Sequence, residues 1–231
     1  ITERLVGSEM CIRDRINRNR YFGHRQTILM RGLYAITDAS VFDPDVLSRQ
    51  VGEVIDGGAV MIQFRHKTTD HGLYQSLAEA VIETCRASET PCLLNDHIHM
   101  AHTLGAHGAH LGQTDGSLSE ARQLLGDQAI LGRTCHDSKE LMEEAVSDGA
   151  SYCAFGRLFE SETKPNAHGL SLSHLSELAE QCPVPMVAIG GITADNGRQV
   201  LDTGVSMLAV SAAVFRAKDI GNAARRLTQL F

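Results

Sequence analysis

The feature that most limits how this chain can fold is an alternation of two patterns, repeated eight times between residues 32 and 231. Short apolar runs, rich in aliphatic residues and bounded by Gly, Pro or Asp, are typical of buried parallel strands. They occupy residues 32–37, 59–64, 91–95, 108–112, 129–133, 151–156, 185–191 and 206–211. Amphipathic stretches separate them, and several begin with Asp, Ser or Thr and end with Gly, as helices prefer.

Eight strand–helix units without a linker rich in Pro or Ser predict a single α/β domain, folded as a (β/α)8 TIM barrel. A doubly wound open sheet is the alternative. Such a sheet usually has fewer units and a G-x-G-x-x-G fingerprint after its first strand. The first turn here, TDASVFD at residues 37–43, lacks that fingerprint. We therefore favour the barrel.

The charge of the chain argues against nucleic acid as a partner. The formal net charge is −7 at pH 7, whereas nucleic-acid binders usually have a basic surplus. Residues 1–31 differ, with seven Arg and three acidic residues. This arm could contact nucleic acid or membrane, but its LVGSEMCIRDR stretch resembles a translated sequencing adapter. We expect residues 1–31 to be a disordered or non-native extension, and residues 32–231 to form the catalytic domain.

The remaining composition points to a cytoplasmic protein. No stretch of about 18 apolar residues is present, so we expect no membrane span. The six cysteines include no CxxC pair, and several lie in apolar runs where a free thiol behaves as a small hydrophobe. A reducing compartment is the simplest interpretation. The sequence does not define the oligomeric state, and a homo-oligomer stays open.

Polar residues cluster at the ends of the predicted strands, where the active sites of such barrels lie. They are Thr37, Asp38, Gln63, Arg65, Lys67, Asn95, Asp96, Gln113, Asp115, Arg133, Thr134, His136 and Ser211, and the last two strands end in Gly190, Gly191 and Val210. Gln63, Arg65 and Lys67 alternate along one strand, so their side chains share one face. Two cations and an amide on one face require either water or an anionic partner.

Asp96 and Asp115 follow neighbouring strands and could converge on one Mg²⁺, which suits one or two carboxylates together with phosphate oxygens and water. Arg65, Lys67 and Lys164 would then form the cationic side of a diphosphate clamp. The competing interpretation makes each Asp a helix N-cap and each cation a surface charge. The joint presence of all these residues at one end of the barrel favours the clamp.

A second anion site is predicted after the last two strands. AIGGIT and AVSAAVF follow strands seven and eight, where barrels of this class often bind phosphate through backbone N–H groups. Glycine lets the backbone approach the anion closely. A diphosphate beside a metal is a leaving group, and a phosphate opposite anchors a second substrate. This arrangement favours transfer of the group that carries the diphosphate to the phosphorylated partner.

These motifs resemble the thiamine-phosphate synthase family over nearly the whole barrel, from GLYAITD to LAVSAAVF. The resemblance depends on the ordered set QFRHK, LLNDHIHMAHTLGAHGAHLGQTDG, ILGRTCH, AFGRLFESETKP and VAIGGIT. It implies a Mg²⁺-dependent enzyme that joins hydroxymethylpyrimidine diphosphate to thiazole phosphate, releasing pyrophosphate. The aminopyrimidine would stabilise a carbocation once pyrophosphate leaves, so the protein mainly positions the substrates and neutralises charge.

The resemblance also implies roles for individual residues. Arg65, Lys67 and Lys164 would be catalytic, and Asp96 and Asp115 would bind Mg²⁺. The pyrimidine diphosphate would meet Gln63, Phe64, Arg65, His66, Lys67, Asn95, Thr134 and Lys164. The thiazole phosphate would meet Ser161, Thr163, Gly190, Gly191, Val210 and Ser211.

Four positions depart from the family pattern. His66 stands where an acidic residue is frequent, although strand alternation turns it away from Gln63 and Arg65. Ser161 replaces a Thr and keeps the hydroxyl. Arg157 replaces a frequent Pro, and Arg133 a frequent apolar residue. Either arginine could contact phosphate or lie on the rim of the site.

Three other interpretations stay open. A thiazole tautomerase of the same barrel family would use His110 and His136 for proton transfer. A non-catalytic barrel would bind thiamine precursors without turnover. The cluster His97, His99, His102, His107 and His110 is a weaker candidate for zinc. Whether the thiazole substrate carries a carboxylate is not defined by the sequence.

Overall fold

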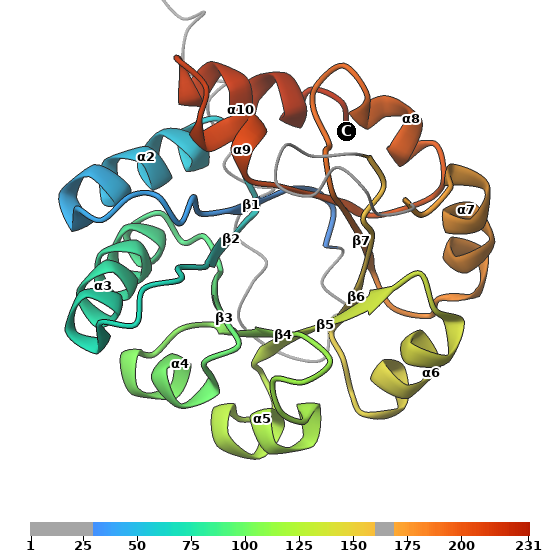
Figure 1. Cartoon of the computed structure of the whole chain (residues 1–231), viewed down its shortest axis with the longest axis horizontal. Helices are drawn as coiled ribbons and strands as arrows, with labels where there is room; N and C mark the ends of the chain where they lie inside the picture. Colours follow the sequence, from blue (N-terminus) through green and yellow to red (C-terminus); the bar gives the residue numbers. More distant parts are fainter. Residues whose placement is uncertain (1–29, 160–168) are drawn as a thin grey trace, which may run out of the picture.

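The computed structural model describes residues 30–159 and 169–231, and these form a closed barrel of parallel strands (Figure 1). The strands pair in chain order, and β1 closes the barrel by pairing with β8. They are β1 Gly32–Ile36, β2 Met61–Phe64, β3 Cys92–Asn95, β4 Gly108–Leu111, β5 Ile130–His136, β6 Tyr152–Phe155, β7 Met186–Ile189 and β8 Met207–Val210. All eight predicted strands are present, and closure excludes the open doubly wound sheet.

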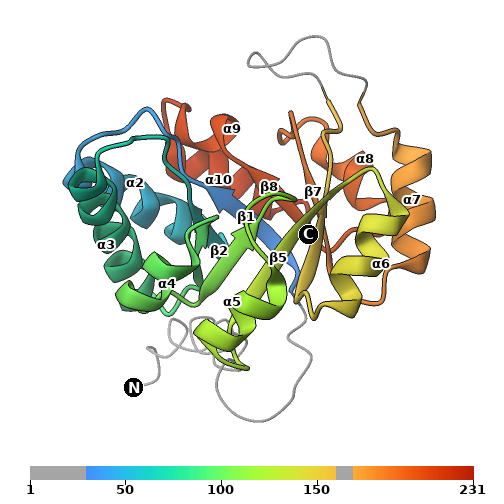
Figure 2. The ribbon, with the colours of Figure 1, turned by 60° about the horizontal axis from the view of Figure 1, so that its bottom comes forward.

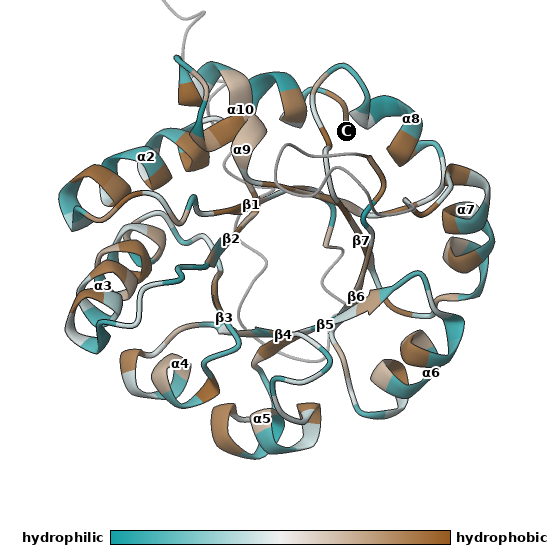
Figure 3. Ribbon diagram, in the orientation of Figure 1, coloured by the Kyte–Doolittle hydropathy of each residue, from teal (hydrophilic) through white to brown (hydrophobic). Residues whose placement is uncertain are grey.

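Helices follow the strands and surround the barrel, as the side view in Figure 2 shows. They are α2 Pro44–Asp56, α3 His71–Ala87, α4 Ile98–Leu104, α5 Leu118–Leu125, α6 Lys139–Ser147, α7 Leu172–Gln181, α8 Gly197–Leu201, α9 Ala212–Phe215 and α10 Ile220–Thr228. Figure 3 shows apolar residues on the sides of the helices that face the strands. None of the helices in the described ranges combines the length and apolar character needed to cross a membrane.

Side-chain caps define where several helices begin. Asp43, Asp70, Ser117 and Ser138 each precede a helix and accept a hydrogen bond from a backbone N–H group of its first turn. Such caps satisfy donors that have no partner inside the helix. At the other end of α4, Gly105 adopts a left-handed conformation with φ 67°, which glycine reaches without strain.

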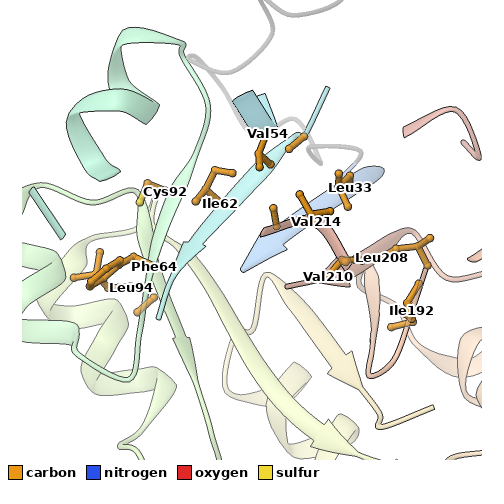
Figure 4. Close-up of a cluster of buried hydrophobic side chains, with 14 of the residues drawn as sticks. Leu33, Val54, Ile62, Phe64, Cys92, Leu94, Ile192, Leu208, Val210 and Val214 are labelled. Atoms are coloured by element: carbon orange, nitrogen blue, oxygen red, sulfur yellow. The ribbon is translucent and has the colours of Figure 1, made fainter. Parts of the chain in front are cut away.

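Strand alternation divides the core into two layers. Leu33 and Ala35 of β1 point outward to the helices, whereas Tyr34 and Ile36 belong to a second cluster inside the barrel. Figure 4 shows the outer layer, with Leu33 and Ile62 close to side chains of the helices. Because both faces of each strand are buried, the strands are apolar nearly throughout, as the sequence indicated.

The structure extends one strand and adds one helix. β5 continues past the predicted residues 129–133 to His136, so Thr134 also lies within the strand, although its register with β6 shifts between Thr134 and His136. The short helix α9 between β8 and α10 was not predicted. Residues 1–29 of the predicted extension lie outside the described part of the chain. Arg31, the last residue of the predicted extension, is described, and its guanidinium donates a hydrogen bond to the carbonyl of Phe231 at 3.4 Å.

Candidate active site

The carboxyl ends of all eight strands meet at one end of the barrel, and the predicted polar residues gather there. At the end of β2, Gln63 is buried, whereas the side chains of Arg65 and Lys67 are exposed. The Thr37 hydroxyl accepts a hydrogen bond from the Arg65 N–H at 2.9 Å and donates one to the Arg65 carbonyl at 3.1 Å. The backbone is therefore held in place while the guanidinium stays open to an anion.

A buried chain of hydrogen bonds crosses the barrel from Gln63 to Thr134. The Gln63 amide donates to the Tyr34 hydroxyl at 2.6 Å, and the Tyr34 and Tyr152 hydroxyls are 2.8 Å apart. Tyr152 contacts Nδ1 of His110 at 2.9 Å, and Nε2 of His110 lies 2.9 Å from the Thr134 hydroxyl. Two of the predicted pyrimidine-binding residues are thus connected through three side chains that were not assigned to that role.

Gly132 makes room for the middle of this chain. A Cβ atom at Gly132 would lie 2.2 Å from the Tyr152 hydroxyl and 2.6 Å from Nδ1 of His110. Burial, followed by the nearby charges of Arg133 and Arg65, lowers the pKa of His110 to about 4. The imidazole is therefore neutral near pH 7, with each ring nitrogen occupied by one hydroxyl.

The two predicted metal ligands lie at the ends of β3 and β4. Burial raises the pKa of Asp96, and the charge of Asp115 raises it further, against the opposing effects of Gly112, Asn95 and Arg65. The two carboxylates are therefore close enough to repel each other. A divalent cation between them would remove that repulsion, so this donor set fits Mg²⁺.

Asp96 is also conformationally unusual. Its φ is 64°, in the left-handed region that residues other than Gly rarely adopt. Its carboxylate accepts hydrogen bonds from the Asn95 amide and, at 3.4 Å, from the Gly112 N–H, while its own N–H donates to the His110 carbonyl at 2.9 Å. Strain of this kind is often found at functional sites, where surrounding contacts hold the residue in place.

The predicted phosphate side lies across the barrel, after β7 and β8. Gly190 and Gly191 have φ values of 111° and 64°, in the region that favours glycine. Asn196 stabilises this turn, because its amide donates to the Gly191 carbonyl at 2.9 Å and its side-chain oxygen accepts from the Thr193 N–H at 2.8 Å. Asn196 is a residue that sequence reasoning missed.

The end of β8 leads directly into α9. Ser211 precedes that helix, and Arg216 follows it, with Nε of Arg216 2.5 Å from the carboxylate of Asp38 at the end of β1. Burial alone would raise the pKa of Asp38, but hydrogen bonds from Arg216 and Ser40 lower it overall. This ion pair joins the β1 end of the site to the phosphate side.

Some predicted residues do not present their side chains to the site. Phe64 is fully buried and packs against Tyr74, and Nε2 of His66 lies 3.1 Å from the Val41 carbonyl, so both side chains face the helices. Val210 belongs to the outer core layer as well. Only the backbone of these three residues could contact a ligand. Ser161, Thr163 and Lys164 lie outside the described residues.

The histidines do not form a metal site. In the described ranges, no three His, Cys, Asp or Glu side chains form a group that could hold a metal ion. His107 accepts a hydrogen bond from the Cys92 N–H at 3.1 Å, and His110 faces the barrel interior. His99 and His102 are exposed on α4. The zinc hypothesis therefore has no geometric support.

Residues 33–214 match the family model of thiamine monophosphate synthase. The chain belongs to this family. The match spans every strand from β1 to β8 and includes the residues of both predicted anion sites. The protein is thus an enzyme of the transferase class with a part in thiamine biosynthesis, and its substrates are small molecules.

Solved structures agree with this assignment. A thiamine phosphate pyrophosphorylase from Pyrococcus furiosus is 30% identical, with a TM-score of 0.77 over 88% of this chain and 96% of that one. A thiamine phosphate pyrophosphorylase from Bacteroides thetaiotaomicron is 15% identical, with a TM-score of 0.63 over 86% of this chain and 96% of that one, a likeness that concerns the fold alone. A 3-hexulose-6-phosphate synthase has a TM-score of 0.67 at 15% identity, over 87% of this chain and 99% of that one, and this likeness concerns the fold alone.

Proposed function

We propose that the protein condenses 4-amino-2-methyl-5-hydroxymethylpyrimidine diphosphate with thiazole phosphate in a Mg²⁺-dependent reaction that gives thiamine phosphate and pyrophosphate. The observation that carries this proposal is the juxtaposition, at one barrel end, of two unlike groups of residues that we expect to bind anions. The exposed side chains of Arg65 and Lys67, which follow β2, adjoin a pair of mutually repelling carboxylates, and a glycine turn lies opposite.

The amide of Gln63 supports recognition of the aminopyrimidine. A side-chain amide both donates and accepts hydrogen bonds, which complements an amino group beside a ring nitrogen. The Tyr34 hydroxyl occupies one amide hydrogen, and so fixes which way the amide of Gln63 points. The second amide hydrogen and the oxygen would then be left for a ring bound in the barrel mouth.

The diphosphate would be bound by Arg65 and Lys67, with Lys164 completing the clamp. Asp96 and Asp115 would hold Mg²⁺, which supplies positive charge to the diphosphate oxygens when it is bound. Arg65 is suited to bidentate contact with phosphate oxygens and Lys67 to a single point contact. The thiazole phosphate would be bound by backbone N–H groups of Gly190, Gly191 and Ser211, with Ser161 and Thr163.

The chemistry requires charge neutralisation more than proton transfer. The bond between the methylene carbon and the diphosphate oxygen breaks, and its electron pair leaves with pyrophosphate. Arg65 and Lys67 stabilise the charge that develops on that oxygen. Gln63 keeps the resulting pyrimidine cation oriented, and the thiazole nitrogen donates its lone pair to form the new C–N bond.

The tautomerase alternative receives no support from the histidines assigned to it. His110 is buried and neutral, and both of its ring nitrogens already have hydroxyl partners. His136 is an exposed residue at the end of β5. Neither ring nitrogen of His110 is therefore free to exchange a proton with a thiazole, and no contact of His136 within the described residues assigns it that role.

The direct test incubates purified protein with both substrates and Mg²⁺ and follows thiamine phosphate with and without EDTA. We expect product that depends on the metal. Folded protein that binds inorganic phosphate but forms no product would refute the synthase and favour the non-catalytic barrel. Product that is unaffected by EDTA would refute the metal requirement alone.

A further inference from the structure

Arg133 makes contacts within the chain that the sequence did not indicate. Its Nη1 donates to the carbonyls of Gly112 at 2.8 Å and Gly116 at 2.9 Å, and its Nη2 lies 3.5 Å from the Gln113 carbonyl. Both hydrogens of Nη1 are therefore used by the protein itself. The guanidinium holds the loop between β4 and α5 from the neighbouring strand β5.

This loop, residues 112–116, carries Asp115. A Cβ atom at Gly112 would lie 2.3 Å from a carboxylate oxygen of Asp115, so the Asp115 side chain folds back over Gly112. The Gly112 N–H also donates to Asp96 at 3.4 Å, and the Gln113 amide donates to the Thr134 carbonyl. The shape of the loop therefore determines where the Asp115 carboxylate lies relative to Asp96.

We propose that Arg133 is a positioning residue that holds loop 112–116 so that Asp115 and Asp96 face one divalent cation. This inference depends on the proposed function, because it assigns a metal to the two carboxylates. Within the loop, the Asp115 N–H donates only a weak hydrogen bond to the Gly112 carbonyl, at 3.4 Å. The contacts from Arg133 to three backbone carbonyls restrict the loop more than this single bond does. The planar fork of arginine provides these contacts, and lysine cannot reproduce them.

The direction in which metal affinity changes on mutation of Arg133 separates a positioning role from a purely electrostatic one. A positive charge near the carboxylates repels a cation, so removing that charge alone would tighten metal binding. Removing a group that positions Asp115 would weaken it instead. Arg133→Met removes both the charge and the fork, whereas Arg133→Lys keeps the charge and loses the fork.

The test measures Mn²⁺ binding to the purified full chain, with free Mn²⁺ counted by electron paramagnetic resonance. We expect Arg133→Met and Arg133→Lys each to raise the Kd for Mn²⁺ by about tenfold or more, as is usual when an outer-shell partner of a metal ligand is removed. Excess Mg²⁺ should displace the bound Mn²⁺. If Arg133→Met does not fold, the Kd of Arg133→Lys alone provides the test.

Arg122 offers a matched control. Its guanidinium binds four backbone carbonyls, those of Gly126, Asp127, Ala129 and Gly149, at 2.6–3.2 Å. These carbonyls lie near the amino end of β5, at the end of the barrel opposite to the site. Arg122→Met should lower the Tm and leave the Kd for Mn²⁺ unchanged.

Three results would overturn the inference. A Kd that stays equal or falls in both Arg133 variants would remove the positioning role, and an equal rise in Arg122→Met would make the effect one of general stability. Wild-type protein that binds no Mn²⁺ would remove the metal site itself. Wild-type protein that binds Mn²⁺ but forms no thiamine phosphate would refute the proposed function, while weaker Mn²⁺ binding in the Arg133 variants would still support the positioning role.

Discussion

Replacing Tyr152 with Phe removes a single oxygen atom from the buried chain of hydrogen bonds between Gln63 and Thr134. That oxygen contacts the Tyr34 hydroxyl at 2.8 Å and Nδ1 of His110 at 2.9 Å. Tyr34 keeps its bond from Gln63, but Nδ1 of His110 is left without a partner in the described structure. A buried polar group that loses its partner costs about 1–3 kcal/mol, and a lost bond elsewhere about 1 kcal/mol.

We therefore expect Tyr152→Phe to lower the free energy of unfolding by about 3 kcal/mol. For a chain of this size, that corresponds to a decrease in Tm of about 6–12 °C. The substitution removes almost no volume, so a cavity does not contribute. Denaturant titration with circular dichroism gives the free energy, provided that the transition is reversible.

Tyr74 is the matched control. It is also a buried tyrosine, but its hydroxyl is a buried oxygen without a hydrogen-bond partner in the described residues. Tyr74→Phe removes an oxygen whose burial is uncompensated, so we expect stability to stay equal or to rise. If Tyr74→Phe destabilises the protein as much as Tyr152→Phe, the hydrogen bonds are not the reason for the loss.

Tyr152→Phe also tests how the site is organised. Without the Tyr152 hydroxyl, the Tyr34 hydroxyl rotates more freely, and the amide of Gln63 loses part of its fixed orientation. We expect the KM for the pyrimidine diphosphate to rise by about tenfold, equivalent to about 1.4 kcal/mol of binding, with a smaller change in kcat. An unchanged KM in a destabilised variant would show that the chain supports the fold and not the substrate.

Three other substitutions test the site. Arg65→Ala should keep its Tm, because the side chain is exposed, yet lose most turnover; unchanged turnover would remove Arg65 from the clamp. Asp96→Asn should abolish metal-dependent turnover and stabilise the metal-free protein. Burial and the charge of Asp115 raise the pKa of Asp96 in the folded protein above its ordinary value of 3.8, so ionisation of Asp96 destabilises the fold. Wild-type stability therefore falls as the pH rises from the unfolded pKa to the folded pKa of Asp96. Denaturant curves at about pH 4 and about pH 7 should show the advantage of the variant growing with pH, and a constant difference would contradict the assignment. Gly190→Ala should lower stability by about 2 kcal/mol and weaken binding of inorganic phosphate, because φ is 111° and the new Cβ would lie 2.6 Å from Cβ of Arg157; wild-type stability would show that the turn adjusts.

Much of the fold could be predicted from the sequence because local pattern and global topology agree. Each apolar run is too short for a helix and is buried on both faces, so it has few alternatives to a parallel strand. The prediction was incomplete where the sequence has no clear apolar run or helical period. β5 continues past Arg133 through Thr134 to His136, because polar side chains there are accommodated by the end of the barrel. The four-residue helix α9 is too short to give a periodic pattern.

The candidate site was predicted less completely, and the reason is physical. Exposed candidate residues such as Arg65 and Lys67 can be recognised in the sequence as unexpected charges after a strand. Tyr34 and Tyr152 are not, because an aromatic residue in an apolar run resembles ordinary core. Their hydroxyls meet only because β1 and β6 face each other across a closed barrel.

By itself, the sequence determined the order of the strands, the end of the barrel at which we propose the chemistry, and the residue types of the two proposed anion sites. Periodicity and strand-end position carry that information, since each depends on neighbours along the chain. Only the tertiary structure decided that Gln63 and Thr134 share a hydrogen-bond chain, that Asp96 and Asp115 repel each other, and that Arg133 binds a loop of its own chain. These contacts join residues from different strands, and their distances are set by closure of the barrel.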